Sequence, residues 1–196
     1  TWQLNKAVQL DCAAATTLSF PTSAGQAGIS INVSNTIIQG SGCLLNGPRT
    51  PSTGNDYLNG NIAVLVNGSN GSNLSNVTIS GLVATNWKKG GIEATYCNNC
   101  LFTQNVISSV SYEGIACVPC SGPISTWNYI TGVSSSNGPA ASALPTNTRT
   151  NAYGISYSTD VVGYSTKGII SDNIVENVPT WECYDTHAGS DLIFSN

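Results

Sequence analysis

The chain has 196 residues, only 8% of them charged, and a formal net charge of −4. Soluble globular chains carry roughly 25% charged residues, and here Asn, Ser, Thr and Gly take their place. Hydrophobic residues make up 40% of the chain, which excludes a disordered protein, and no apolar run approaches the roughly 18 residues that span a membrane. The acidic balance argues against nucleic acid, which demands basic patches. We therefore expect one folded domain over residues 1–196, with neither nucleic acid nor a membrane as partner.

The first segment, Thr1 to Leu10, has apolar residues at mixed spacing and fits a helix and a strand equally well. From Gly28 onward, short apolar alternations are separated by Gly, Asn and Ser, which indicates strands and turns. Two stretches interrupt this pattern, Asn46 to Asn59 and Ser134 to Ala152, and they are rich in Pro, Gly, Ser or Ala. Loops of this kind often carry a binding surface.

Residues 103–110, 126–133 and 171–178 can be laid over one another, with Asn in the third position and Val in the eighth. The shared Asn residues are Asn105, Asn128 and Asn173. A degenerate repeat built from strands without helices is typical of a solenoid. We expect each strand to pair in parallel with its equivalent one turn away, at roughly 4.8 Å. The recurring Asn side chains should then hydrogen-bond to one another along the axis.

With these repeats, the chain from about Gly28 to its end resembles the right-handed parallel β-helix proteins of the pectate-lyase-like and polygalacturonase-like superfamily. The resemblance implies an all-β fold, a single right-handed parallel β-helix of roughly seven to eight turns at about 22 residues per turn. The superfamily includes polysaccharide lyases, hydrolases and epimerases, and also tailspikes, adhesins and structural proteins. The resemblance therefore implies a fold and no single activity.

The densest polar cluster, residues 181–189, contains the only His of the chain. If Tyr184 faces inward along a strand, Asp185 and His187 project from the same outer face. A carboxylate beside an imidazole is suited to acid–base chemistry, so Asp185, His187, Tyr184 and Glu182 are the candidate catalytic residues. The alternative is that Asp185 caps a turn and His187 is an ordinary surface residue.

The Asp-x-His spacing is similar to the Asp-Pro-His element of alginate C5-epimerases. Thr186 stands where that family has Pro, and Glu182 stands where it has a catalytic Tyr. The resemblance implies uronate chemistry, which needs a cation for the uronate carboxylate and a base for the C5 proton. Glu93 falls level with Asp185 in the repeat. The candidate substrate-binding residues are Lys88, Lys89, Glu93, Trp181 and Lys167.

Other chemistries of the superfamily lack their motifs in this chain. Polygalacturonase-type hydrolysis needs paired carboxylates, and no Asp-Asp pair or Gly-His-Gly motif is present. A calcium-dependent lyase needs clustered acids and an arginine base, but the acids are dispersed and Arg49 and Arg149 fall in the two loops. We expect no metal and no cofactor.

Seven cysteines indicate an oxidising compartment, so we expect a secreted or cell-surface protein. No signal peptide is visible, which favours a mature or excised segment. Five sequons for N-glycosylation agree with this compartment. Their acceptor residues are Asn32, Asn67, Asn70, Asn73 and Asn76.

The pairs Cys97-x-x-Cys100 and Cys117-x-x-Cys120 have spacings compatible with a four-thiolate zinc site. Stacking of consecutive turns instead puts Cys97 level with Cys120, within disulfide range. The preferred interpretation is therefore disulfide formation. The predicted pairs are Cys97–Cys120, Cys100–Cys117 and Cys12–Cys43, with Cys183 left over.

The leading hypothesis is an extracellular polysaccharide-active protein with uronate lyase or C5-epimerase chemistry. The alternative is a non-catalytic fibre, adhesin or tailspike segment that binds glycans or associates end to end. The last residues, Asp191 to Asn196, begin another turn without a polar cap, which favours a longer chain or an end-stacked assembly. The sequence leaves open whether the protein is an enzyme.

Overall fold

The computed structural model describes residues 1–20, 27–48, 61–134, 152–179 and 181–195. Within these residues the protein is all-β and contains no helix. The segment that fits a helix or a strand equally well is therefore strand, and most of the two predicted loops, with Arg49 and Arg149, lies outside the described residues. No helix in the described part of the chain is long and apolar enough to cross a membrane.

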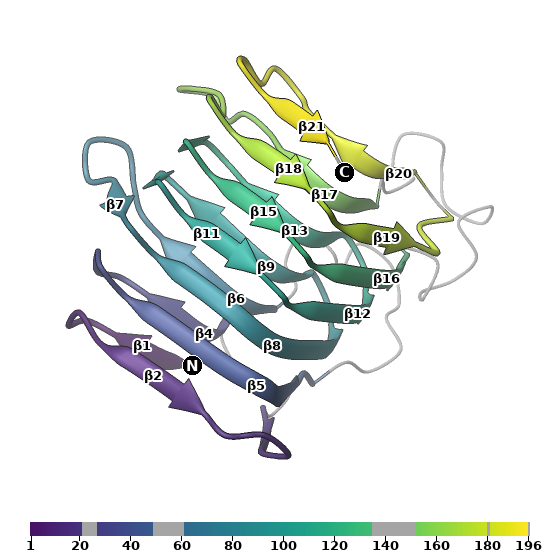
Figure 1. Cartoon of the computed structure of the whole chain (residues 1–196). Coiled ribbons are helices and arrows are strands. Elements are labelled where there is room, and N and C mark those ends of the chain that lie inside the picture. Colours follow the sequence, from purple (N-terminus) through teal and green to yellow (C-terminus); the bar gives the residue numbers. More distant parts are fainter. Residues whose placement is uncertain (21–26, 49–60, 135–151, 180, 196) are drawn as a thin grey trace.

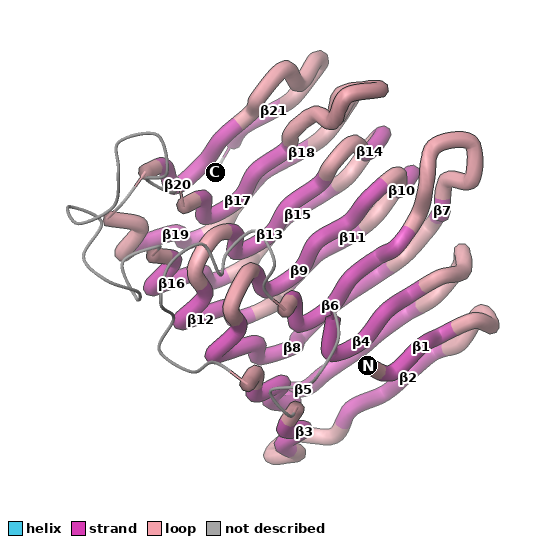
Figure 2. The backbone as a smooth tube through the Cα atoms, turned by 180° about the vertical axis from the view of Figure 1, so that it is seen from behind, coloured by secondary structure: helices cyan, strands magenta, loops and turns pink. Residues whose placement is uncertain are grey.

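One sheet has seven parallel strands in the order β1-β4-β6-β9-β13-β17-β20 (Figures 1 and 2). These strands are β1 (Trp2–Leu4), β4 (Ala27–Ile31), β6 (Ile62–Asn67), β9 (Gly90–Thr95), β13 (Glu113–Cys117), β17 (Tyr153–Tyr157) and β20 (Glu182–Asp185). Each strand follows its neighbour at the next passage of the chain, so equivalent residues of successive repeats lie side by side.

A second, eleven-stranded sheet has the order β19-β16-β12-β8-β11-β15-β18-β21, with β5 paired to β8 and β2 and β3 paired to β5. Its strands are β2 (Gln9–Cys12), β3 (Thr17–Ser19), β5 (Ile37–Asn46), β8 (Thr78–Trp87), β11 (Leu101–Thr103), β12 (Val106–Val110), β15 (Ile124–Thr126), β16 (Tyr129–Val133), β18 (Ile169–Ser171), β19 (Ile174–Glu176) and β21 (Ile193–Ser195). A small third sheet joins β7 (Leu74–Ser75), β10 (Cys97–Asn98) and β14 (Cys120–Ser121). Every strand pairing in the three sheets is parallel, as the repeat predicts.

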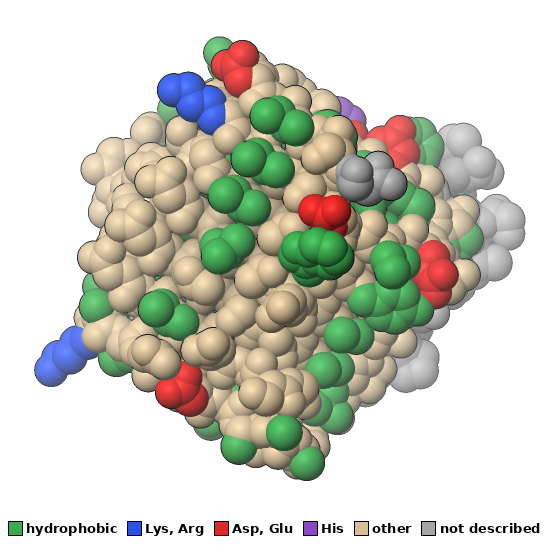
Figure 3. Space-filling model, viewed as in Figure 1, with side chains coloured by type: hydrophobic (Ala, Val, Ile, Leu, Met, Phe, Trp, Pro, Cys, Tyr) green, Lys and Arg blue, Asp and Glu red, His purple; other side chains and the backbone are tan. Residues whose placement is uncertain are grey.

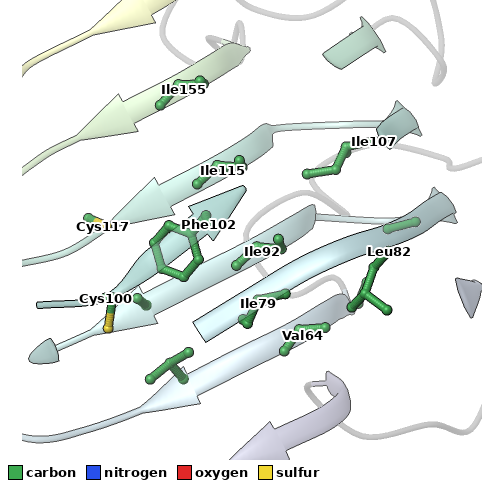
Figure 4. Close-up of a cluster of buried hydrophobic side chains, with 14 of the residues drawn as sticks. Val64, Ile79, Leu82, Ile92, Cys100, Phe102, Ile107, Ile115, Cys117 and Ile155 are labelled. Carbon is green, nitrogen blue, oxygen red and sulfur yellow. The ribbon is translucent and has the colours of Figure 1, made fainter. Parts of the chain in front are cut away.

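The core consists of rows of like side chains on successive strands. Val64, Ile92, Ile115 and Ile155 occupy equivalent positions of β6, β9, β13 and β17 and are buried (Figure 4). Branched aliphatic side chains suit such positions because they pack closely against the same side chain on the next strand.

The predicted Asn ladder is confirmed. Oδ1 of Asn128 accepts hydrogen bonds from the backbone N and Nδ2 of Asn105 at 3.0 and 3.1 Å. Oδ1 of Asn173 accepts the same two bonds from Asn128, both at 2.9 Å. The residue before each Asn has a positive φ, which turns the chain between two strands of the eleven-stranded sheet. These residues are Gln104 (57°), Trp127 (58°) and Asp172 (54°).

The outer face of the eleven-stranded sheet alternates apolar and polar rows. Figure 3 views this face and shows rows of hydrophobic side chains separated by uncharged polar ones, with few charges. Ile124, Ile169 and Ile193 form part of one row. The ion pairs of the described residues, Lys89–Glu93 and His187–Asp185, lie at the seven-stranded sheet.

The cysteines correct one prediction. The structure joins Cys12 to Cys43, as predicted. It also places Cys97 level with Cys120, but the bond forms between Cys97 and Cys100, whose Cα atoms are 6.2 Å apart. The predicted pairs Cys97–Cys120 and Cys100–Cys117 are wrong because Asn99, with φ 53°, reverses the chain and returns Cys100 toward Cys97.

The bonded pair also removes two of the four thiolates that a zinc site would need. Within the described ranges, no three His, Cys, Asp or Glu side chains are arranged to hold a metal ion. Two disulfides are consistent with an oxidising compartment.

Candidate functional site

A row of outward positions crosses the seven-stranded sheet and carries two carboxylates. Glu93, Ala116, Ser156 and Asp185 are register partners on β9, β13, β17 and β20. The predicted alignment of Glu93 with Asp185 is therefore confirmed. Because the neighbouring positions of these strands face the core, the row lies on the outer face.

Asp185 and His187 form a hydrogen-bonded pair on this face. Nδ1 of His187 lies 2.6 Å from Oδ2 of Asp185, and the Ser156 hydroxyl donates to the same oxygen at 3.4 Å. A carboxylate has only acceptors, so in the neutral form of the imidazole the proton is on Nδ1 and Nε2 keeps a free lone pair. The His187 side chain is 56% exposed while that of Asp185 is 9% exposed. The pair therefore presents a basic nitrogen to solvent from an anchored carboxylate.

Lys89 forms an ion pair with Glu93 of this row, and their side chains are 19% and 13% exposed. The carbonyl of Lys89 accepts hydrogen bonds from the backbone N–H groups of Tyr112, at 2.9 Å, and Glu113, at 3.3 Å. Lys89 is thus fixed both by its backbone and by its side chain. It supplies a cation within the group of acidic residues.

Glu113 is the residue that the sequence reasoning missed. Glu113 pairs with Gly90 on β9 and with Tyr153 on β17, and Tyr153 pairs with Glu182 on β20. These residues form a second row that faces outward. Glu113 is 6% exposed. Burial, above all, raises the pKa of Glu113 to about 8; the charge of Glu93 raises it further, Lys89 opposes this, and Asp185 adds a smaller increase. Glu113 therefore carries a proton at neutral pH.

The backbone explains why Glu113 faces outward. Strict alternation would put it on the same side as Ile115, two residues later, which lies in the core. However, Gly114 also faces inward, since a Cβ there would lie 2.6 Å from Cγ2 of the core residue Ile130. Two successive inward positions reverse the alternation and turn Glu113 outward. The signal in the sequence is a Gly before the core Ile at 91–92, 114–115 and 154–155.

Aromatic contacts connect the two rows. The ring of Tyr153 meets the ring of His187 edge-on, with centroids 5.9 Å apart. The ring of Tyr112 also packs edge-on against Tyr153, with centroids 5.6 Å apart. We call the combined group the outer-face cluster. It consists of Lys89, Glu93, Glu113, Tyr153, Asp185 and His187.

The structure separates Tyr184 from this cluster. Tyr184 continues the inward row after Ile155, as expected for a strand residue, and its hydroxyl donates to the carbonyl of Asn173 at 3.1 Å. Burial, above all, raises its pKa. Tyr184 lines a cavity of about 320 Å³ between the sheets together with Phe194 and Ile170.

The remaining predicted site residues lie at the margins. Glu182 is exposed beyond Tyr153, and Trp181, 54% exposed, precedes β20. Lys88 lies between β8 and the cluster residue Lys89. Lys167 lies before β18, where its backbone N–H donates to the carbonyl of Ser190, and none of the described side-chain contacts joins it to the cluster.

The sequon residues form a separate surface feature. Asn67, Asn70, Asn73 and Asn76 are exposed and Asn32 is half-buried. Several of these amides bond to Asn side chains of the neighbouring repeat, for example Asn76 Nδ2 to Asn35 Oδ1 at 3.0 Å. Exposure makes the four sites accessible to modification.

Comparison with protein-family models, with curated proteins and with solved structures finds no match to this chain. Function is therefore inferred from the chemistry of the outer-face cluster.

Proposed function

We propose that the protein is an extracellular, polysaccharide-active enzyme that acts on uronate polymers as a lyase or C5-epimerase. Its fold would be a right-handed parallel β-helix of roughly seven to eight turns, which the in-register parallel pairing of successive repeats supports. The observation that carries the proposal is the hydrogen-bonded Asp185–His187 pair on one outer face, beside the row that holds Glu113, whose pKa burial raises to about 8. This arrangement supplies a basic nitrogen and an acid.

In the lyase reaction, Nε2 of His187 takes the C5 proton of a uronate. The electrons of the C5–H bond form the C4–C5 double bond while the C4–O bond breaks, and Glu113 gives its proton to the departing oxygen. In the epimerase reaction, the carbanion instead receives a proton at C5 from the opposite face. Lys89 and the neutral Glu113 reduce the repulsion that a uronate carboxylate meets at a site with Glu93 and Asp185.

The test is incubation with alginate, polygalacturonate and other uronate polymers. Elimination creates an unsaturated uronate that absorbs in the ultraviolet, and epimerisation changes the C5 signals in proton NMR. We expect activity in the wild-type protein, with losses in His187→Ala and Glu113→Gln. Glu176→Gln is the matched control, because Glu176 is exposed on β19 of the other sheet. If no uronate polymer gains either a C4–C5 double bond or an inverted C5, the proposal is contradicted.

Glycoside hydrolysis is the second candidate, and the raised pKa of Glu113 beside Glu93 and Asp185 favours it. Hydrolysis needs one protonated carboxyl group as the acid and one ionised carboxylate as the base or nucleophile. The cluster contains more carboxylates than cations, which suits a neutral glycan. New reducing ends without a double bond identify this reaction.

A non-catalytic, end-to-end associating protein is the alternative from a different class. The described sheets end in apolar surface, with Trp2 48% exposed on the first strand and Phe194 48% exposed on the last. Apolar side chains including Leu10 and Leu18 line a cavity of about 260 Å³ near the first strands. Concentration-dependent growth in sedimentation velocity, abolished by Phe194→Asp, supports this alternative, and a monomer at all concentrations contradicts it.

A further inference from the structure

Four cysteines lie in the core where β13 of the seven-stranded sheet leads into the small third sheet. Cys97, Cys100, Cys117 and Cys120 all belong to the main hydrophobic core, and Figure 4 shows Cys100 and Cys117 among its side chains. Cys97 and Cys120 are register partners on β10 and β14. Cys97 and Cys100 are bonded, while Cys117 and Cys120 carry free thiols.

The two free thiols are close to one another. Cys117 ends β13, Cys120 begins β14, and only two residues separate them. Cys117 is the register partner of Ala94 on β9. Cys117 and Cys120 are 0% and 4% exposed. Sγ of Cys120 also lies 3.5 Å from the carbonyl oxygen of Ala94, one strand below. Both cysteines are thus buried on either side of the turn between β13 and β14.

The neighbouring pair shows that this spacing suits a disulfide here. Cys97 and Cys100 are also separated by two residues across a turn, and their Cα atoms lie 6.2 Å apart, within the usual range for a disulfide. Cys183, the third free cysteine, lies on β20 beyond β17. Because Cys183 lies on a more distant strand, the spacing of two residues selects Cys120 as the partner of Cys117.

We propose that Cys117 and Cys120 are joined by a third disulfide in the mature protein. Two S–H bonds break and one S–S bond forms, and the two protons and two electrons released reduce an external disulfide, such as oxidised glutathione, to two thiols. Burial raises the pKa of the Cys117 thiol, so in the folded protein Cys117 forms little of the thiolate that attacks disulfides. Exchange is faster in the unfolded chain, and the bond forms during folding.

The proposed Cys117–Cys120 disulfide constrains the strand that carries the acid of the outer-face cluster. β13 begins at Glu113 and ends at Cys117. A Cys117–Cys120 bond ties the end of β13 to β14 independently of any reaction at the outer face. The presence of this disulfide can therefore be tested independently of the proposed function.

The test is disulfide mapping of the full chain after refolding in a mixture of reduced and oxidised glutathione. The protein is denatured without reductant, alkylated with iodoacetamide, digested and analysed by mass spectrometry. We expect one alkylated cysteine, Cys183, and a peptide containing Cys117 and Cys120 that is two hydrogens lighter than its reduced form. Alkylation of both Cys117 and Cys120 overturns the proposal, as does a Cys97–Cys120 or Cys100–Cys117 link.

Two variants make the assignment specific. Cys183→Ser should leave no cysteine available for alkylation, and Cys117→Ser should expose Cys120 to alkylation while Cys97–Cys100 stays intact. If Cys117→Ser fails to fold, the wild-type map and Cys183→Ser still decide the outcome. Alkylation at any position other than Cys183 in the wild-type protein contradicts the assignment.

Discussion

Glu113 and Tyr153 are register partners on β13 and β17, and the ring of Tyr153 packs edge-on against His187 at 5.9 Å. Tyr153 thus joins the protonated acid to the Asp185–His187 pair. This geometry leads to specific expectations for catalysis and stability.

The Asp185–His187 pair should be required for activity. Asp185→Asn replaces an acceptor by a group that can donate, so Nδ1 is no longer held as the protonated nitrogen. We expect the turnover on the active uronate polymer to fall by about 10²- to 10⁴-fold in both Asp185→Asn and His187→Ala. Glu176→Gln is the control and should retain wild-type turnover. Equal activity in Asp185→Asn and the wild-type protein would exclude this pair as the base.

Glu113 should make stability fall as the pH rises. Its folded pKa of about 8 is raised above the ordinary value of 4.5, so the folded state holds the proton more tightly than the unfolded state. The stabilising contribution of the neutral acid is complete below pH 4.5 and is lost between pH 4.5 and about 8, with a limiting slope of about 1.4 kcal/mol per pH unit.

Urea unfolding from pH 5 to 8 measures this effect. Glu113→Gln should flatten the dependence and be more stable than the wild-type protein at the upper end. Glu182→Gln is the matched control, because Glu182 lies in the same row but is exposed, and it should keep the wild-type slope. A wild-type slope in Glu113→Gln would contradict a buried neutral acid.

The activity should follow the same ionisation. If Glu113 donates the proton, kcat decreases as the pH passes about 8, because the acid is then ionised. Lys89→Gln removes the cation that lowers the pKa of Glu113, so the decrease in kcat should move to higher pH. The measurement is the pH profile of kcat for both proteins, and a shift to lower pH would contradict the assigned electrostatics.

The Asn ladder should contribute substantially to stability. Asn128 is 2% exposed, and its side chain bonds to the backbone and side chain of Asn105 and to Asn173. Asn128→Ala leaves buried polar groups unpaired, and we expect a loss of about 3 kcal/mol in the free energy of unfolding. Asn67→Ala, which removes one exposed hydrogen bond to Asn32, should cost about 0.5 kcal/mol or less. Similar losses in the two variants would argue against the ladder.

The Cys12–Cys43 disulfide should stabilise the first strands. It joins β2 to β5 across a sequence separation of 31 residues. Removal of a bond that closes a loop of this length typically costs about 3 kcal/mol, so the double variant Cys12→Ser/Cys43→Ser should unfold at lower urea concentration. Cys183→Ser, which removes a free thiol, serves as the control. An unchanged midpoint would show that the bond does not constrain the unfolded chain.

Much of the strand arrangement could be predicted from the sequence. The Asn at a constant place in each repeat predicts the ladder, because only a stacked arrangement satisfies each amide from its equivalent. The same alignment places Glu93 level with Asp185, and Cys97 level with Cys120. Side chains at equivalent positions of parallel, in-register strands must lie side by side, so periodicity alone determines these relationships.

Only the tertiary structure decided which groups form the site and which sulfur atoms bond. Glu113 faces outward because Gly114 and Ile115 both face the core, a local reversal that a strict alternation rule does not contain. Cys97 bonds to Cys100 because Asn99 turns the chain back on itself. The repeat determines which residues share a level, whereas the direction of each side chain depends on backbone turns within that level, and those turns decide the chemistry of the outer face.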